Sequence, residues 1–264
     1  MSCWTRPRAE AHGPHGWRAW GIALLPLLLL VALVIGSLSV PTRIRDYQQR
    51  YFAALPARIH AEHPRYRDTL ARPTGDWQLA SLAPGNGHNA TYAGGAFWLN
   101  GVPDASARAS VAAWTTGSYS DAAVEVTARE VGSAADPSSD GVGLLARAGN
   151  GQSVAFVANN EGDWGFYRYE VDRPSPSWSS IKTGDFFPAP SHDNTPIRLL
   201  LVMRGATYLF YVNDEYVGSF TDDEFRSTPR AGRVGVIVLG QPSAGVFTNF
   251  AGYPVTSPPS LEYV

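Results

Sequence analysis

A long uncharged stretch near the N-terminus constrains this chain more than any other feature. Residues 19–40 read AWGIALLPLLLLVALVIGSLSV, which is 22 residues without a charged side chain. At about 1.5 Å per helical residue, a helix of this length spans the hydrocarbon core of a bilayer, which is roughly 30 Å thick. Trp17 and Trp20 lie where aromatic side chains gather at a membrane interface. The stretch therefore predicts one transmembrane helix.

Two alternatives to an uncleaved anchor remain. A cleaved signal peptide has a shorter apolar region, about 7 to 15 residues, and a small-x-small cleavage site, which residues 36–40 match poorly. A buried helix of a soluble fold is the other alternative. The positive-inside rule does not orient the helix, because the arginine counts on its two sides nearly tie. The arginines that flank the stretch are Arg6, Arg8 and Arg18 before it, and Arg43, Arg45, Arg50 and Arg58 after it.

Charge divides the chain into a basic head and an acidic body. Residues 1–72 carry 10 Arg and 4 acidic residues, a net +6, and residues 73–264 carry 10 Arg, one Lys and 19 acidic residues, a net −8. The total of −2 argues against a general nucleic-acid binder, which needs a clustered positive face. The single cysteine, Cys3, excludes an internal disulfide framework and a cysteine-based zinc site.

The head has three predicted parts. Residues 1–18 form a basic tail, residues 19–40 the membrane helix, and residues 41–72 a connector. Within the connector, residues 45–55 have a spacing compatible with a helix that Pro56 interrupts. The connector is interpreted as a solvated stalk, with an amphipathic segment on anionic lipid as the alternative.

The body, residues 73–256, is predicted to be all-β, followed by a tail over 257–264. Apolar and polar residues alternate with a period of two over short segments, and Gly, Pro, Asn and Asp separate these segments. Residues 159–162 and 213–214 have the composition of tight hairpin turns. About twelve strands result, which suits two packed antiparallel sheets. The expected strands are 77–80, 96–100, 110–114, 122–129, 142–147, 153–158, 163–171, 197–203, 207–212, 215–220, 233–239 and 245–250.

Several short motifs in the body resemble a known family. They are GVGLLAR at 141–147, GDWGFYR at 162–168, YVN at 211–213, GRVGV at 232–236 and VFTNF at 246–250. Together they resemble the concanavalin A-like (laminin G-like) jelly rolls of exported bacterial proteins, in the branch described as 3-keto-disaccharide hydrolase-like. The resemblance implies a two-sheet antiparallel jelly-roll sandwich that stands outside the membrane on its anchor. It does not choose among lectins, glycanases and adhesion modules. Asp214 and Thr248 depart from the family pattern, which usually has Gly and Asp there.

A glycoside hydrolase is the enzyme alternative, with Glu125 and Glu130 as the catalytic candidates. Retaining glycosidases need two carboxyl groups about 5 to 5.5 Å apart, and laminarinase-type relatives place them with a Glu-x-Asp-x-x-Glu strand. This chain keeps the outer glutamates and has Thr127 in the middle. Residues five apart on a regular strand face opposite sides, so two solvated charges are the simpler interpretation. His88 and His192 lie in predicted loops without a triad motif.

Calcium is the one cofactor that the chain could hold, and no other cofactor is predicted. Many jelly rolls of the resembled kind bind calcium through loop oxygens, and Asp136 and Asp140 are the candidates here. No EF-hand spacing is present, so a solvated acidic loop is the simpler interpretation.

Glycan binding is predicted from the pattern in residues 163–171. Trp164, Phe166, Arg168 and Glu170 share one side of this strand, and their mixed polarity predicts a solvent-facing row. Arg147 is expected to face outward on a neighbouring strand, and Trp178 to overhang the same face. The ligand-binding candidates are Arg147, Trp164, Arg168 and Trp178. Alternatively, Trp164 and Phe166 are core residues with Arg168 at the edge; Trp77, Trp98 and Trp114 are expected in the core.

The sequence thus predicts a single-pass membrane protein with an extracytoplasmic jelly roll. Its expected function is non-catalytic binding of a carbohydrate or a cell-envelope surface, because a sugar site needs flat aromatic groups beside fixed donors. The alternatives are a glycoside hydrolase of the same fold and a structural spacer or sensor domain in an envelope assembly.

Overall fold

The computed structural model describes residue 50 and residues 52–80, 90–101, 109–114, 117–132, 141–149, 152–170, 177–186, 195–222, 231–240 and 244–255. Residues 19–40 lie outside this part of the chain, so the predicted anchor stays a prediction. Among the described residues, no helix has both the length and the apolar character that a membrane crossing needs.

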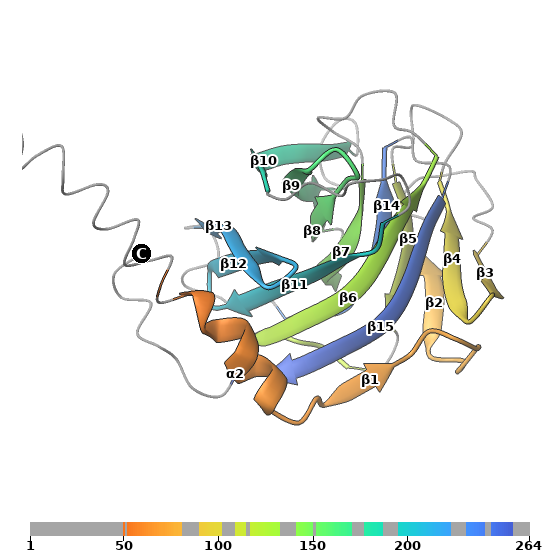
Figure 1. Ribbon diagram of the computed structural model, residues 1–264, viewed down its shortest axis with the longest axis horizontal. Coiled ribbons are helices and arrows are strands. Elements are labelled where there is room, and N and C mark those ends of the chain that lie inside the picture. The colour runs from red at the N-terminus through yellow and green to blue at the C-terminus, as the bar shows by residue number, and fades with distance from the viewer. Residues whose placement is uncertain are drawn as a thin grey trace, which may run out of the picture. The chain divides into compact units, whose positions relative to one another are not determined.

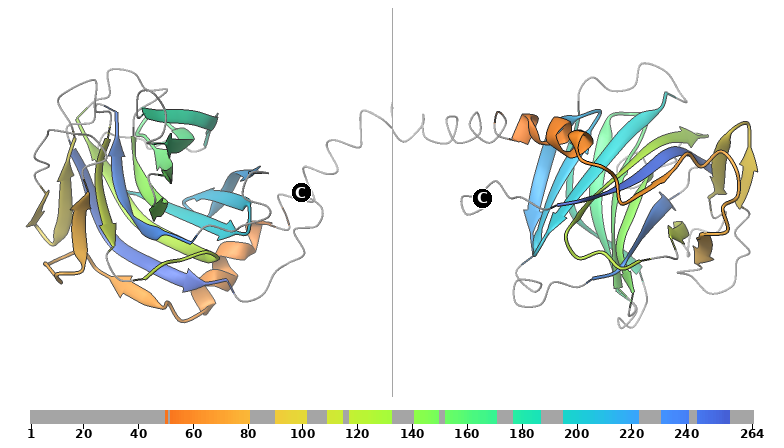
Figure 2. Two further views of the ribbon diagram at one scale, coloured as in Figure 1. Left: turned by 180° about the vertical axis from the view of Figure 1, so that it is seen from behind. Right: turned by 90° about the horizontal axis from the view of Figure 1, so that it is seen from below.

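The described strands form two antiparallel sheets, which are consistent with the predicted jelly-roll sandwich (Figure 1). Sheet A has the order β13 (Glu215–Thr221), β12 (Thr207–Val212), β11 (Ile197–Arg204), β6 (Ala122–Val131), β15 (Ala244–Pro254), β4 (Ala96–Asn100) and β3 (Ala90–Ala93), and β1 (Tyr66–Asp68) also pairs with β15. Sheet B has the order β10 (Ser177–Asp185), β9 (Asp163–Glu170), β8 (Gln152–Ala158), β7 (Gly141–Gly149), β14 (Arg233–Leu239), β5 (Ala109–Trp114) and β2 (Trp77–Ala80). Figure 2 shows the same layers from two further sides.

The hydrophobic core lies between the sheets and follows the predicted alternation. On β6, Val124, Val126 and Ala128 are buried in the core, whereas Glu125 and Thr127 between them are only partly buried. Side chains on a strand alternate between faces, so this pattern gives β6 one core face and one outer face. Aromatic rings fill the part of the core between β8, β9 and β12. They are Phe156, Trp164, Phe166 and Phe210, with ring centroids 4.8–6.2 Å apart.

Sheet B is apolar on both faces, which corrects one prediction. A second buried cluster lies on its other face, away from the main core. Its residues are Leu145, Ala148, Ala155, Val157, Tyr167, Tyr169, Trp178, Ile237 and Leu239. The row Trp164, Phe166 and Arg168 was expected to face solvent because it is more polar than the row between. In the structure, Trp164 and Phe166 belong to the core. The alternative interpretation of these two side chains as core residues is confirmed.

Helix α2 (Leu55–Ala61) packs on the outer face of sheet A near the ends of β6 and β15 (Figure 1). Pro56 lies in the first turn of α2, where a missing backbone donor costs nothing. Before it, residues 50, 52 and 53 are helical and Ala54 is in a turn, so the helical path is interrupted next to Pro56; residues 45–49 of the predicted helix lie outside the described residues. Phe52 stacks on Tyr216 with ring centroids 4.9 Å apart, and its carbonyl accepts a hydrogen bond from the Tyr211 hydroxyl at 3.3 Å. Phe52 and Ile59 are buried. The second half of the predicted stalk is therefore packed against the sandwich.

Candidate functional site

A band of polar side chains runs across the outer face of sheet A beside α2. It consists of Trp98, Thr127, Arg129, Arg198 and Thr248, which we call the outer strip. Each of these residues is partly buried, and each stands on the strand side opposite the core row. Neighbouring strands fix the spacing of these groups, so the outer strip is a rigid surface rather than a loop.

The first row of the outer strip combines an indole with a guanidinium. Trp98 on β4 and Arg129 on β6 both pair with Val246 of β15, which lies between them. Arg129 reaches across Val246, and its Cζ lies 5.7 Å from the centre of the Trp98 ring. Val246 is only 6% exposed. The Trp98 indole N–H donates to the Ala93 carbonyl at 3.1 Å, which fixes the ring.

The second row carries two hydroxyls and an arginine. Thr127 of β6 pairs with Thr248 of β15 on one side and with Arg198 of β11 on the other. Directly after Thr248, the β15–β6 register shifts, and Asn249 adopts a positive φ of 54°. This bulge returns Phe250 to the core side and leaves Thr248 on the outer side. The two threonine hydroxyls therefore lie side by side on the outer strip.

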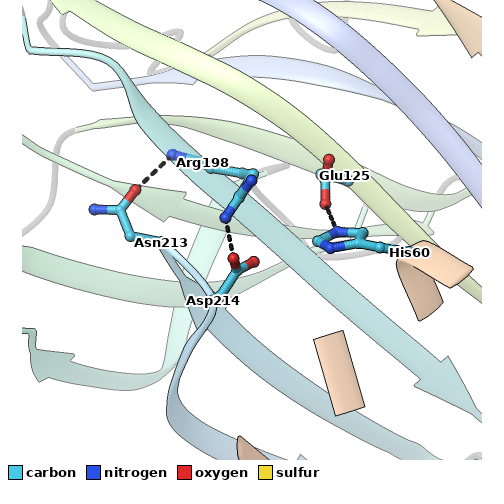
Figure 3. A network of polar contacts seen from close by, with 5 residues as sticks. All are labelled: His60, Glu125, Arg198, Asn213 and Asp214. Atoms are coloured by element: carbon cyan, nitrogen blue, oxygen red, sulfur yellow. Dashed lines mark hydrogen bonds and ion pairs between the residues drawn. The ribbon is translucent and has the colours of Figure 1, made fainter. Parts of the chain in front are cut away.

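The β12–β13 hairpin holds Arg198 at one end of the outer strip (Figure 3). Asn213 and Asp214 have φ values of 51° and 68°, the pair of positive angles that a tight type I′ turn needs. This confirms the predicted turn. Asp214, at the position where the resembled family usually has Gly, forms an ion pair with the Arg198 guanidinium. The Asn213 side-chain oxygen accepts a hydrogen bond from the Arg198 backbone N–H at 3.0 Å.

A hydrogen bond between α2 and β6 bounds the outer strip on the other side. His60 of α2 contacts Glu125 of β6, as Figure 3 shows. The two side chains are 29% and 12% exposed. The His60 ring also lies 6.1 Å from the Tyr253 ring of β15. Beyond this pair, α2 covers the outer face of sheet A.

The two catalytic candidates do not converge. Glu125 faces α2, while Glu130 is buried on the core-row side of β6 and accepts a hydrogen bond from the Asn160 backbone N–H at 3.1 Å. The β6–β11 register runs without interruption through Glu125. The prediction that residues five apart on this strand face opposite sides is confirmed, whereas their interpretation as two solvated charges is wrong, because Glu130 is 2% and the Glu125 side chain 12% exposed.

Arg147 lies inside the sandwich, so its predicted outward orientation is wrong. Its φ is 51°, and the β7–β8 register shifts between Ala146 and Gly149. This bulge turns the side chain toward sheet A, where its Cζ lies 5.0 Å from the centre of the Tyr208 ring. Its guanidinium donates to the carbonyls of Ser120, at 3.3 Å, and Gly205.

Arg168 lies at the same end of the sandwich and pairs with buried Asp222. Burial raises the pKa of Tyr208, and the positive charges of Arg147 and Arg168 oppose that rise. Two of the four predicted ligand-binding residues thus link sheet B to sheet A through buried polar contacts.

The two predicted tryptophans are also buried. Trp164 is 4% exposed within the core, and Trp178 is 8% exposed, with its ring 5.3 Å from that of Tyr169. The roles of Arg147, Trp164, Arg168 and Trp178 in ligand binding stay predictions.

The calcium candidates Asp136 and Asp140 lie outside the described residues, as do His88 and His192. Within the part of the chain that the structure describes, no group of three or more His, Cys, Asp or Glu side chains is arranged to hold a metal ion.

Sequence reasoning missed the outer strip as a unit. Trp98 was expected in the core, yet it is partly buried on the outer face. The alternation on β6 already placed Glu125, Thr127 and Arg129 on one polar face. The missing information was register: only the pairings of β4, β15 and β11 with their neighbours bring Trp98, Thr248 and Arg198 to that face.

Comparison with known proteins supports the fold. No protein-family model and no curated protein matches this sequence. Among solved structures, a carbohydrate-binding module, CBM66 from Bacillus subtilis, matches with a TM-score of 0.52 at 15% identity, covering 67% of this chain and 95% of that one. A protein of unknown function with a galectin-like fold, also from Bacillus subtilis, matches with a TM-score of 0.53 at 15% identity, covering 73% and 97%.

A structure of endo-acting O-glycanases from the human gut microbiota matches with a TM-score of 0.50 at 12% identity, covering 74% of this chain and 100% of that one. These likenesses show that the chain has a galectin-like, concanavalin A-like jelly-roll fold. Binding modules and glycoside hydrolases both occur among its structural neighbours.

Proposed function

We propose that this protein is a carbohydrate-binding module and that the outer strip is its binding surface. The observation that carries the proposal is the contact between the Arg129 guanidinium and the Trp98 ring, beside the neighbouring threonines Thr127 and Thr248. The shared fold with a carbohydrate-binding module supports it.

The chemistry of the outer strip suits a sugar. A sugar ring has apolar C–H faces surrounded by hydroxyls, so its site needs a flat apolar surface next to fixed donors and acceptors. Trp98 supplies the apolar surface, and hydroxyls both donate and accept hydrogen bonds. Because these groups stand on paired strands, little conformational entropy is lost when a glycan binds.

Binding is favoured over catalysis by the positions of the two glutamates. Glycoside hydrolysis needs two carboxyl groups that face one glycosidic bond. Glu125 and Glu130 lie on opposite sides of β6, and each already has a partner in His60 and Asn160. A glycoside hydrolase remains the alternative, since a glycanase shares the fold.

The binding experiment uses the full chain in detergent and a panel of immobilised polysaccharides. Trp98→Ala should weaken binding by at least about tenfold, because tryptophan is enriched among the few interface residues whose truncation costs about 2 kcal/mol or more. Arg67→Ala, at an exposed position of β1, is the control and should bind as the wild type does. If Trp98→Ala leaves binding unchanged, the outer strip is not the binding surface. Release of reducing sugar that disappears in Glu125→Gln would favour the enzyme instead.

We further propose that residues 19–40 anchor the chain in a membrane and that the sandwich is extracytoplasmic. The uncharged stretch supports the anchor, and the resemblance to exported domains supports the orientation. Protease added to intact cells should remove the sandwich and leave the basic tail protected. Protection of the sandwich until the membrane is permeabilised would reverse the proposed topology.

A further inference from the structure

We propose that the glycan bound by the outer strip is anionic, and that the Arg129 guanidinium binds a sugar carboxylate, as in a uronic-acid polymer. This inference rests on the proposed carbohydrate-binding function and names the class of glycan.

Arg129 is the uncommitted cation of the outer strip. Within the described part of the chain, its guanidinium has no hydrogen-bond acceptor and no ion-pair partner. Its contact there is a cation–π contact with the Trp98 ring. Arg198, by contrast, is paired with Asp214. On the neighbouring helix, His60 is paired with Glu125.

The contact with Trp98 leaves the N–H donors of Arg129 available, because a cation–π attraction uses none of them in a hydrogen bond. A guanidinium carries five such donors in one plane. Two of these donors match the two oxygens of a carboxylate in a bidentate pair. The contact with Trp98 also restricts the long side chain before a ligand arrives, which lowers the entropy that binding would cost.

The two described carboxylates of β6 do not cancel the charge of Arg129. Glu125 is four residues away along β6, about 13 Å at 3.3 Å per residue, which exceeds the Debye length of about 8 Å at physiological ionic strength. It is also paired with His60. Glu130, although adjacent in sequence, lies on the opposite side of β6 and accepts the Asn160 N–H. Among the described residues, Arg129 is therefore the charged group at the Trp98 end of the outer strip that no carboxylate balances, on a body whose net charge is −8.

A neutral glycan would not require such a group. Hydroxyl ligands are served by Thr127 and Thr248 in the second row. An unpaired guanidinium beside them gains most from a ligand that carries negative charge, because hydrogen bonds between two ionised groups are about twice as strong as neutral ones.

The experiment compares matched acidic and neutral glycans on the full chain in detergent. Polygalacturonate is measured against its methyl ester, and chondroitin sulfate against its desulfated form. Wild-type protein should bind polygalacturonate at least about tenfold more tightly than the ester, and added salt should weaken only the acidic interaction. Arg129→Gln should remove this preference, and Arg129→Lys should restore it only in part, because an ammonium group does not form the bidentate pair. Arg67→Gln is the charge-matched control and should retain it.

The outcomes separate this inference from the proposed function. Equal binding of polygalacturonate and its ester, lost in Trp98→Ala, would overturn the anionic ligand and leave carbohydrate binding in place. Binding that depends on sulfate and not on carboxylate would overturn the assignment of a uronic acid. Absence of binding to every glycan, neutral or acidic, would overturn both proposals together.

Discussion

Replacement of Trp164 by Ala separates a core residue from a ligand-binding residue. The sequence pattern placed Trp164 on a sugar-binding row, whereas the structure places it in the core, 4% exposed. Its ring lies 5.3 Å from the Phe210 ring and 6.2 Å from the Phe156 ring. Two glycines make room for it, because a Cβ on Gly184 or Gly218 would approach the indole to 2.9 or 3.0 Å. We therefore expect Trp164→Ala to reduce stability rather than affinity.

The expected loss is large compared with the stability of a domain. Trp→Ala in a core typically costs about 3–5 kcal/mol, from lost burial and the cavity left behind. Domains are stable by about 5–15 kcal/mol in total. For a domain of about 150–250 residues, each kcal/mol lowers Tm by about 2–4 °C, so the expected decrease is about 6–20 °C.

Trp164→Phe is the matched control. It keeps an aromatic ring in the cluster and removes an indole N–H that is buried without a hydrogen-bond partner within the described residues. Because burying such a group is unfavourable by about 1–3 kcal/mol, its removal offsets part of the lost volume. We expect Trp164→Phe to lose less than half as much in Tm as Trp164→Ala.

The assay is thermal unfolding of the full chain, followed by near-UV circular dichroism, with glycan binding measured well below Tm. The expected result is a lower Tm with affinity for glycan within twofold of the wild type. An unchanged Tm combined with lost binding would refute the core assignment and return Trp164 to the ligand surface.

Three further predictions test the packing elsewhere. Gly143→Ala should destabilise the protein by about 1–3 kcal/mol or more in urea unfolding, because the added Cβ would lie 2.0 Å from the Phe156 carbonyl oxygen. Gly149→Ala is the control and should be near neutral, because a Cβ there would have no atom within 4 Å. Equal effects of the two substitutions would contradict the register of β7. Tyr211→Phe removes the hydrogen bond from the Tyr211 hydroxyl to the carbonyl of Phe52, just before α2, and should weaken the attachment of α2 to sheet A by about 0.5–1.5 kcal/mol. Amide hydrogen exchange should become faster in α2 and change little in β11. Burial raises the pKa of Tyr66 and Tyr211 above the ordinary value of about 10, so the folded state holds these protons more tightly than the unfolded state. The free energy of unfolding should therefore be constant with respect to these two groups below about pH 10, and should fall above it by up to about 1.4 kcal/mol per pH unit for each tyrosine. Phenolate absorbance should appear together with unfolding rather than before it.

Local sequence predicted the strands of the body well because most of them carry their own signal. The alternation on β6 and the turn at Asn213 and Asp214 depend on residues adjacent in the chain, and both predictions are confirmed. Residues 159–162 also form the predicted turn, in which the Asn159 side-chain oxygen accepts the backbone N–H groups of Glu161 and Asp163. These features need no knowledge of distant segments.

The faces of β9 could not be predicted in the same way. A polarity contrast identifies the buried face only when the other face is wet. Here Tyr167 and Tyr169 are buried on one face of β9, and Trp164 and Phe166 on the other. The charge of Arg168 made its row look exposed, although that charge is paired with Asp222 inside the sandwich. Which partner a buried arginine finds is a property of tertiary structure.

A bulge explains why one binding candidate, Arg147, faces inward although its strand lies where it was predicted. One extra residue in a strand reverses the side on which the following side chains stand. At Arg147 the bulge turns a predicted surface arginine toward Tyr208, and at Asn249 it keeps both Thr248 and Phe250 on the faces that suit them. Arg147 and Asn249 both have positive φ. An arginine rarely adopts this conformation, and nothing in the surrounding sequence predicts it. A site composed of neighbouring strands therefore depends on a few backbone positions whose sequence signal is weak, and the outer strip became recognisable only once the strand register was known.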